Sequence, residues 1–230
     1  MINKELVKKH CPYLSDAQLD MLDIYAEELV QWNKKMNLTA ITQPDEIAIK
    51  HFVDCLMLLE HAELRENARV IDVGTGAGFP AMVLKIARND LDFTLVDALN
   101  KRLVFLQEVL QKTGLDAQLV HARAEDLGKE PEYREAFDYS VARAVAPMNV
   151  LCEYCLPFVK VGGELVALKG SNDDVTPAMA AIEELGGELK ANVSYKLPNG
   201  DSRSIVIIKK ISHTPTKYPR KTKKITSCPL

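Results

Sequence analysis

The spacing of apolar side chains along the chain changes near residue 69. Before that point, apolar residues recur at the three- and four-residue intervals of an amphipathic helix. Ser15 followed by Gln18 forms a capping-box pattern, which predicts the start of one helix, and residues 44–59 predict a second. Each helix has one apolar face, so both must pack on another part of the chain.

After residue 69, short apolar runs alternate with segments of helical pattern. This alternation predicts right-handed crossovers and a mostly parallel sheet with helices on both faces. Two last apolar segments, 188–196 and 203–209, are joined by a turn with Asn199-Gly200, so an antiparallel hairpin is expected there. The other predicted strands are 69–73, 93–96, 118–121, 137–141 and 164–168, and the predicted helices are 80–88, 101–113, 150–158 and 176–185.

The pattern as a whole predicts an α/β fold with a mostly parallel, seven-stranded sheet. We expect residues 1–64 to be a helical extension packed on the core, 65–212 to be the core, and 213–230 to be a basic C-terminal arm. No apolar stretch approaches the roughly 18 residues of a membrane span. The first residues lack the apolar region of a secretory signal. A cytoplasmic protein without a membrane partner is predicted, with a monomer as the default.

The five cysteines are odd in number and scattered, which is typical of a reducing compartment. We therefore expect no disulfide bonds. Cys152 and Cys155 form a C-x-x-C pair, but they lie in an apolar helical pattern and no second pair completes a zinc site. They are predicted to be small buried residues. The five histidines show no ligand spacing either, so no metal is predicted.

The net charge of −3 hides a marked asymmetry. Residues 202–230 contain eight Lys and Arg residues and no Asp or Glu, which leaves 21 basic against 32 acidic residues in 1–201. A basic tail on an acidic body indicates a polyanionic partner. The alternative is a solvated arm that binds nothing.

A glycine-rich loop, Gly74-Thr75-Gly76-Ala77-Gly78, follows the first predicted strand. Alternate glycines let a backbone turn sharply and approach a ligand, at the position where open α/β sheets bind theirs. Phe79 stands where a dinucleotide fingerprint needs a small residue, and no Gly-Lys-Ser or Gly-Lys-Thr follows as in a P-loop. The loop therefore suits a nucleoside-like ligand without a pyrophosphate.

The ends of the second and third strands carry further candidates. Asp97 ends the second strand 23 residues after Gly74, near the spacing of an acid that binds ribose hydroxyls, although it can also cap the next helix. Lys101 and Arg102 begin that helix against the preference of its dipole, which indicates an anion nearby. After the third strand, residues 123–126 could bracket an adenine edge or form a turn.

These motifs resemble a known class of enzymes. Residues 72–80 and 97–102 are similar to class I S-adenosylmethionine-dependent methyltransferases, which have a Rossmann-like fold. Further motifs resemble the bacterial ribosomal RNA small subunit methyltransferase G family, also called glucose-inhibited division protein B. They are Trp32-Asn33-Lys34-Lys35-Met36-Asn37-Leu38-Thr39, residues 50–54, 142–146 and 168–170, and Tyr218-Pro219-Arg220-Lys221.

The resemblance implies methylation of N7 of a guanine in a conserved loop of 16S rRNA near the decoding region, with S-adenosyl-L-methionine as donor. The substrate is then 16S rRNA or the small ribosomal subunit. The chain departs from the family at Ala81, where glycine is usual, and in 222–227, which lacks the usual glycine. Together, the resemblance and the residues at the strand ends predict these cofactor contacts: Gly74, Gly76, Gly78, Phe79, Asp97, Ala98, Ala124, Glu125 and Arg143.

Guanine N7 carries an unprotonated lone pair, so its methylation needs no general base and rests on positioning. The segment 142–145 lacks the Asn/Asp-Pro-Pro-aromatic mark of exocyclic amine methylation, and no cysteine is placed for pyrimidine C5. Arg143 is expected at the reacting centre, donating to guanine O6 or a phosphate; the alternative is a salt bridge to an acid such as Glu125. His51 and Asp54 are expected to tie the helical extension to the sheet, and Trp32 to lie in the core.

RNA contact is expected through neutralisation of phosphates. Two other functions remain open: methylation of another RNA, a protein or a small molecule, and RNA binding without catalysis. The expected RNA-binding residues are Lys34, Lys35, Lys101, Arg102, Lys169, Arg203, Arg220 and Lys221.

Overall fold

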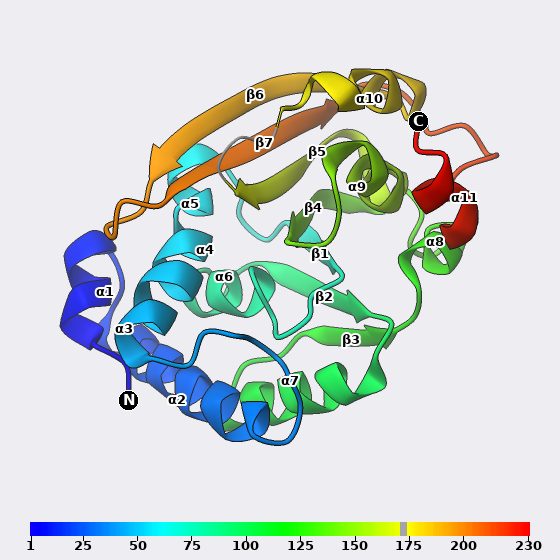
Figure 1. The fold of residues 1–230 in the computed structure, drawn as a ribbon. Coiled ribbons are helices and arrows are strands. Elements are labelled where there is room, and N and C mark those ends of the chain that lie inside the picture. Colours follow the sequence, from blue (N-terminus) through cyan, green and yellow to red (C-terminus); the bar gives the residue numbers. More distant parts are fainter. Residues whose placement is uncertain (171–173) are drawn as a thin grey trace.

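The computed structural model describes residues 1–170 and 174–230, and its centre is one mixed sheet (Figure 1). Within the described residues the sheet has seven strands in the order β3-β2-β1-β4-β5-β7-β6. The strands β3, β2, β1, β4 and β5 run parallel to one another, and β7 runs antiparallel to both β5 and β6. The strands are β1 (Arg69–Val73), β2 (Asp92–Asp97), β3 (Gln118–His121), β4 (Phe137–Arg143), β5 (Val159–Gly170), β6 (Gly187–Lys196) and β7 (Ser202–Lys210).

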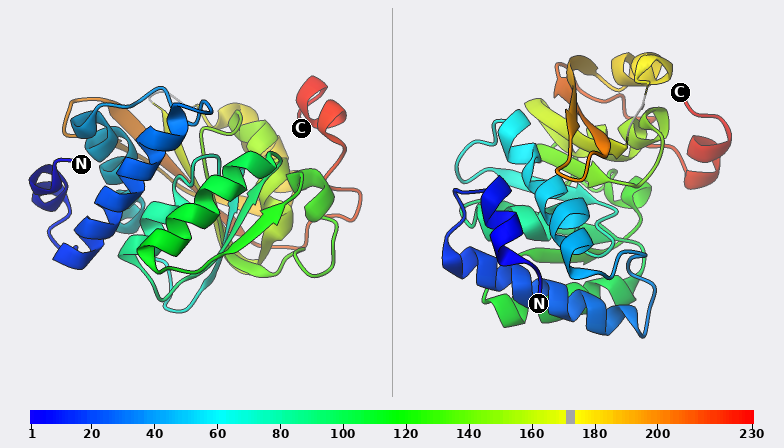
Figure 2. Two further views of the ribbon diagram at one scale, coloured as in Figure 1. Left: turned by 90° about the horizontal axis from the view of Figure 1, so that it is seen from below. Right: turned by 60° about the vertical axis from the view of Figure 1, so that its left-hand side comes forward.

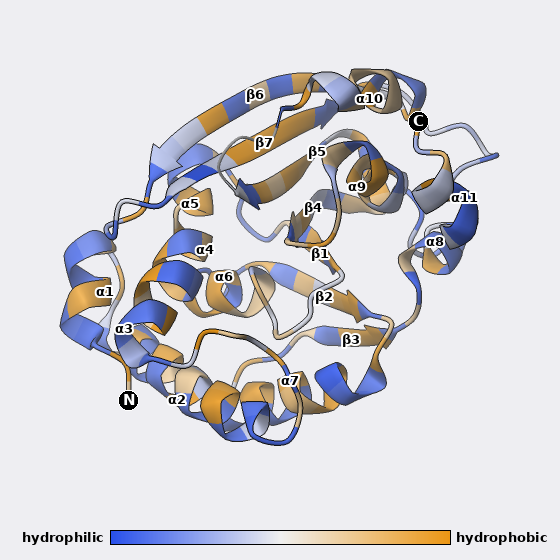
Figure 3. Ribbon diagram, in the orientation of Figure 1, coloured by the Kyte–Doolittle hydropathy of each residue, from blue (hydrophilic) through white to orange (hydrophobic). Residues whose placement is uncertain are grey.

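Burial along the strands follows their place in the sheet. The central strands β1, β2 and β4 are buried at almost every position, as expected for parallel strands covered on both faces. The edge strand β6 alternates between exposed and half-buried positions, which is the period of a strand with one face toward water. The hydropathy colours of Figure 3 show the same contrast.

Helices cover both faces of the sheet and bury two separate clusters of apolar side chains. Val70 belongs to one cluster and its neighbour Ile71 to the other, because successive side chains of a strand point to opposite faces. On the first face, α2 and α7 lie side by side (Figure 2). The first face carries α1 (Lys4–His10), α2 (Asp16–Asn33), α6 (Ala81–Ala87) and α7 (Asn100–Thr113), and the second carries α8 (Ala124–Leu127), α9 (Met148–Cys155) and α10 (Met179–Glu184).

The helix predicted over 44–59 is not continuous. It consists of α3 (Pro44–Ile47), the π-helical segment η1 (Ala48–Val53), α4 (Asp54–Leu56) and α5 (Leu58–His61). A π-helical turn inserts a residue into the helical ladder and redirects the side chains around it. The segment η1 contains His51, which the functional site uses. The capping box predicted at Ser15 and Gln18 is present at the start of α2.

Strand β5 is longer than predicted and begins at Val159 instead of 164. Gly162 and Gly163 precede the predicted strand but lie inside the observed one, at an irregularity in its pairing with β4. Gly162 has a φ of +89°, and a Cβ at Gly163 would collide with the backbone oxygen of Asp138. Glycine therefore bends this strand without ending it.

The C-terminal segment is docked on the second face and ends in α11 (Thr222–Ser227). Tyr218 and Ile225 are buried, and the Arg134 guanidinium donates to the carbonyl oxygens of Tyr218 (2.8 Å) and Thr214 (2.7 Å). The basic arm predicted for 213–230 is thus a packed element. Among the described residues, no helix has the length and apolar character that crossing a bilayer requires.

Candidate functional site

Two hollows lie at the carboxyl ends of the strands, one on each side of the point where the sheet order reverses between β1 and β4. This is where open α/β sheets bind their ligands. The first, here called the β1–β3 pocket, has a volume of about 150 Å³. It is lined by Val73, Gly74, Val96, Asp97, Ala98, Ala122, Arg123, Ala124, Glu125, Val145, Tyr154 and Thr222.

The second hollow, here called the β4–β7 pocket, has a volume of about 430 Å³. The two pockets adjoin just after the end of β4: Ala144 lines the β4–β7 pocket, and the next residue, Val145, lines the β1–β3 pocket. The β4–β7 pocket is rich in cations. Its lining residues are Ile41, Lys50, His51, Asp54, Arg143, Ala144, Leu168, Lys169, Gly170 and Arg203.

The glycines of the loop have different roles. Gly74 has a φ of +71°, and a Cβ there would lie 3.1 Å from Val145 at the wall of the β1–β3 pocket. Gly78, with a φ of +95°, is buried instead beneath the helices, and a Cβ there would lie 2.7 Å from side-chain atoms of Leu106 and Met82. Gly74 therefore permits the close approach of Val145 at the pocket wall, whereas Gly78 permits the close approach of helices.

The buried carboxyl of Asp72 holds the loop together. Its Oδ2 accepts hydrogen bonds from Thr75 Oγ1 (2.7 Å) and from the backbone N–H of Ala81 (3.3 Å). Burial raises the pKa of Asp72 to about 7. Ala81, which replaces the family's usual glycine, is fully buried and keeps this backbone contact. The departure at Ala81 therefore leaves the loop intact.

Asp97 projects its carboxylate into the angle between the glycine loop and the start of α7. Its oxygens accept from the backbone N–H groups of Gly76 (2.9 Å) and Leu99 (2.8 Å) and from the Arg102 guanidinium (3.2 Å). Helix α7 has Leu99 as its N-cap and no side-chain cap, so the alternative role of Asp97 as a helix cap is wrong. The anion that was expected near Arg102 is the carboxylate of Asp97.

The other walls of the β1–β3 pocket suit a flat apolar ring with a diol. Val73, Val96 and Val145 give apolar surface. The Asp97 carboxylate lies at the wall, where a diol that displaces the Arg102 guanidinium can donate hydrogen bonds to it. Ala124 and the buried Glu125, predicted to lie at an adenine edge, also line the pocket. This set of residues fits the adenosine half of S-adenosylmethionine.

Arg143 lies at the wall of the β4–β7 pocket, with its guanidinium held by the protein. It donates to Asp54 Oδ2 (3.0 Å), to the Lys50 carbonyl oxygen (3.1 Å) and to His51 Nδ1 (2.9 Å). Its centre lies 4.6 Å from the Phe79 ring. Burial disfavours its charge, but the neighbouring Cys55, Asp54 and Tyr25 together outweigh this and the pKa of Arg143 is raised. The alternative role of Arg143, a salt bridge to an acidic residue, is therefore present, and the acidic residue is Asp54 and not Glu125.

His51 is neutral in this arrangement. Burial and the Arg143 cation lower the pKa of His51 to about 3. Since a guanidinium can only donate, Nδ1 accepts and Nε2 carries the hydrogen toward Thr39 Oγ1 (2.9 Å). The ring is stacked on Phe79 with centroids 4.3 Å apart.

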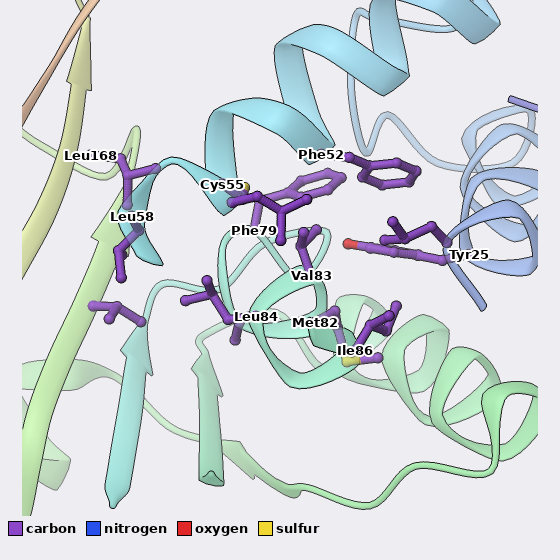
Figure 4. Packing of buried hydrophobic residues seen from close by; sticks show 14 of the residues in the cluster. Tyr25, Phe52, Cys55, Leu58, Phe79, Met82, Val83, Leu84, Ile86 and Leu168 are labelled. Carbon is purple, nitrogen blue, oxygen red and sulfur yellow. The ribbon is translucent and has the colours of Figure 1, made fainter. Parts of the chain in front are cut away.

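The link between the N-terminal helices and the sheet runs through these residues, as predicted for His51 and Asp54. Asp54 also accepts a hydrogen bond from Tyr195 Oη (2.9 Å) of β6. The ring of Tyr25 from α2 packs on Phe52 and Phe79, which are seen together in Figure 4. The tip of the glycine loop is thus held by helices that come before it in the chain.

The eight cations predicted to bind RNA do not form one surface. Lys169 and Arg203 lie in the β4–β7 pocket, where Lys169 Nζ donates to the Ala146 carbonyl oxygen (2.9 Å). Arg102 and Arg220 are held by Asp97 and Glu153. The exposed Lys34, Lys35, Lys101 and Lys221 are spread over the ends of three helices.

Sequence reasoning missed Lys50, Tyr154 and Thr222. Lys50 stands in a motif quoted for the family resemblance, directly before His51. Tyr154 of α9 and Thr222 of α11 line the β1–β3 pocket from segments distant in the chain, and no local pattern marks them.

Trp32 is half-buried and packs on Phe105, as its predicted core position requires. Cys152 and Cys155 are buried free thiols, as predicted. In the described part of the chain, no group of three or more His, Cys, Asp or Glu side chains is arranged to hold a metal ion.

Comparison with known proteins decides the family. The model of the family described as rRNA small subunit methyltransferase G (GidB) matches residues 18–196. The chain belongs to this family. A family member named ribosomal RNA small subunit methyltransferase G from Thermoanaerobacter sp. (strain X514) is 50% identical over 222 residues, covering 95% of this chain and 92% of that protein. One from Alkaliphilus oremlandii (strain OhILAs) is 48% identical over 221 residues, covering 94% and 92%.

Solved structures of lower identity support the fold of this family member. TrmN from Thermus thermophilus matches with a TM-score of 0.55 at 20% identity, over 69% of this chain and 48% of that one. A SAM dependent methyltransferase from Aquifex aeolicus matches with a TM-score of 0.54 at 17% identity, over 77% of this chain and 97% of that one. The predicted fold class and the predicted family are both confirmed.

Proposed function

We propose that the protein transfers the methyl group of S-adenosyl-L-methionine to N7 of a guanine in 16S rRNA, in the conserved loop near the decoding region. The observation that carries the proposal is the adjacency of the two pockets at Ala144 and Val145. One pocket has the features of an adenosine site, and the other is cationic and open at the surface. The substrate is inferred from the family, which is described as rRNA small subunit methyltransferase G.

The residues of the β1–β3 pocket would bind and orient the donor. Asp97 would accept hydrogen bonds from the ribose hydroxyls, and the valine side chains would hold the adenine ring, beside Gly74 at the pocket wall. The donor supplies an electrophilic methyl group on a sulfonium. Holding that methyl group and N7 in line accounts for most of the catalysis that such a site can provide.

The β4–β7 pocket would hold the target nucleotide. Lys50, Lys169 and Arg203 give positive charge for the RNA backbone near the base. Because N7 has no proton to lose, the reaction makes no demand on the neutral His51 as a base. Arg143, already bound to Asp54 and His51, contributes positive potential and a rigid wall at the end of β4.

Mapping of modified nucleosides tests the proposal. Mass spectrometry of 16S rRNA from cells with and without the gene is expected to show one 7-methylguanosine that is lost on deletion and restored by the wild-type gene. Purified protein with radiolabelled donor is then expected to label small-subunit rRNA or particles from the deletion strain. An unchanged set of modified nucleosides after deletion would reject the proposed substrate.

A further inference from the structure

Helix α11 forms part of the wall of the β1–β3 pocket. Its first residue, Thr222, lines the pocket together with Tyr154 of α9 and Ala124 of α8. Figure 1 shows α11 beside α8, on the side toward which β2 and β3 point, and Figure 2 agrees. The last element of the chain therefore reaches the site of the predicted donor.

A buried ion pair fixes α11 in this place. Glu153 of α9 is fully buried and accepts hydrogen bonds from three groups of Arg220: its backbone N–H (2.7 Å), Nε (2.9 Å) and the terminal guanidinium nitrogen (2.6 Å). Ile225 is buried as well. A carboxylate buried this deeply needs its partner, because an unpaired charge there is costly. The segment that carries α11 is thus held in one position.

The positive charge of the tail is mostly compensated by acids of the core, except on α11. Lys209, Lys217 and Arg220 each pair with a glutamate. Across the described residues, three exposed lysines next to Thr222 make no ion pair, and neither does the exposed Arg123 at the rim of the same pocket. The three lysines are Lys221, Lys223 and Lys224.

We infer that α11 is an RNA-docking element at the rim of the donor pocket. The RNA strand that approaches the rim of the donor pocket binds through its phosphates to Lys221, Lys223, Lys224 and Arg123. Thr222, next to these lysines in the chain, faces the donor. The inference rests on the proposed function for the identity of the partner. It adds that one short helix contributes to both binding sites.

A triple variant tests the RNA contact. K221Q/K223Q/K224Q removes three charges without changing side-chain length much. The control K9Q/K160Q/K190Q removes three charges elsewhere: Lys9 lies on α1, and Lys160 and Lys190 pair with Asp138 and Glu164, which keep Arg65 and Lys209 as partners. The probe is a 16S rRNA fragment with the target loop, titrated over a salt series. The slope of log K against log salt is expected to fall by about 2 to 3 in the triple variant, because each lost phosphate contact accounts for roughly 0.7 to 0.9.

A second pair of variants tests the wall. Thr222→Phe places a ring in the pocket and is expected to weaken binding of S-adenosylhomocysteine at least tenfold by calorimetry. Ser227→Phe, at an exposed position about 140° around the helix axis from Thr222, is expected to leave that affinity unchanged. The triple lysine variant is expected to bind S-adenosylhomocysteine like the wild type.

An unchanged salt slope in the triple variant, or an equal effect in the control, would overturn the RNA contact. Wild-type affinity for S-adenosylhomocysteine in Thr222→Phe would overturn the wall. These measurements follow binding and not methyl transfer. They succeed or fail separately from the nucleoside mapping, which alone decides the proposed function.

Discussion

Asp97 shows how much one carboxylate can contribute to the donor pocket. It already accepts hydrogen bonds from the backbone of Gly76 and Leu99, so it ties the glycine loop to the start of α7 before any ligand binds. A hydrogen bond from a neutral group to a charged one contributes about 1.5–3 kcal/mol. The carboxylate therefore orders the pocket, and a diol that donates to it takes the place of the Arg102 guanidinium.

Asp97→Ala is expected to weaken binding of S-adenosylmethionine by roughly ten- to a hundredfold, because a charged acceptor is lost. Affinity for the 16S rRNA fragment is expected to stay within about twofold. Calorimetry with the donor and anisotropy with the RNA measure the two. Asp92→Ala, at the exposed opposite end of β2, is the control. Loss of RNA binding with retained donor binding would contradict the assignment.

The buried neutral His51 predicts a pH dependence of stability. Its pKa is about 3 in the folded protein against 6.5 for an unperturbed histidine. Between these values the unfolded chain binds more protons, so the free energy of unfolding falls as the pH drops below about 6.5. From pH 7.5 to 5.5 the His51 contribution is expected to decrease by about 1.4 kcal/mol.

Urea unfolding of the wild type and His51→Gln at both pH values measures this decrease. The glutamine side chain can still accept a hydrogen bond from Arg143 but does not titrate. The wild type is expected to lose about 1.4 kcal/mol more than the variant. Equal losses would show that His51 titrates normally in the folded protein.

At the scale of elements, the glycine loop is shaped by the helices packed on it. Tyr25 of α2 donates a hydrogen bond to the Ala77 carbonyl oxygen, and Phe52 of η1 packs on the Tyr25 ring. Gly78 lies under α7 through its contact with Leu106. The loop that serves the ligand is therefore supported by elements that the first 60 residues supply.

Gly78→Ala is expected to destabilise the protein by about 3 kcal/mol. A positive φ costs an alanine roughly 1–2 kcal/mol, and crowding against Leu106 and Met82 adds a similar amount. Gly114→Ala is the control, since Gly114 has a φ of +68° but open space around its Cβ position. It is expected to cost only the conformational part. Urea unfolding measures both, and equal effects would argue against close packing at Gly78.

At the scale of the whole molecule, the N-terminal helices and the sheet share one apolar cluster. Leu22 and Tyr25 of α2 belong to the same cluster as Phe93 and Leu95 of β2. Residues 1–64 thus pack on α6 and α7 and complete the apolar layer on the first face of the sheet. A segment that covers so much apolar surface is expected to unfold together with the surface it covers.

This sharing predicts one cooperative unfolding transition. Trp32, the single tryptophan, lies at the end of α2 and reports on the N-terminal helices. Its fluorescence and the far-UV circular dichroism of the whole chain are expected to change at the same urea concentration. A fluorescence transition at clearly lower urea would show that the extension unfolds by itself.

The compensation of charge is also a property of the whole molecule. The asymmetry between the acidic body and the basic tail indicated a polyanionic partner. In the folded protein, however, many of the tail's cations form ion pairs with acidic residues of the core. The buried Lys210 lies 3.2 Å from Glu135, and Arg220 pairs with Glu153. Among the described residues of the tail, the charge that remains for a partner is concentrated at α11, on Lys221, Lys223 and Lys224.

The sequence by itself determined the α/β class, the order and approximate limits of the strands, the glycine loop and Asp97. These follow from local signals: the period of apolar residues, the glycine spacing and the residue at a strand end. Each is complete within about 30 residues. The interruption of the 44–59 helix by a π-helical segment and the bulged start of β5 were beyond such patterns, because packing on the sheet overrides local preference.

Only the tertiary structure decided the partners of side chains that are far apart in the chain. Arg143 forms an ion pair with Asp54, and Arg220 forms one with Glu153. Thr222 lines the same pocket as Gly74 of the loop after β1. Apolar periodicity states which face of an element is buried, but it is the same for many arrangements of those faces. Which charges meet depends on how the elements are placed in space, and that placement alone separates a free cation from a paired one.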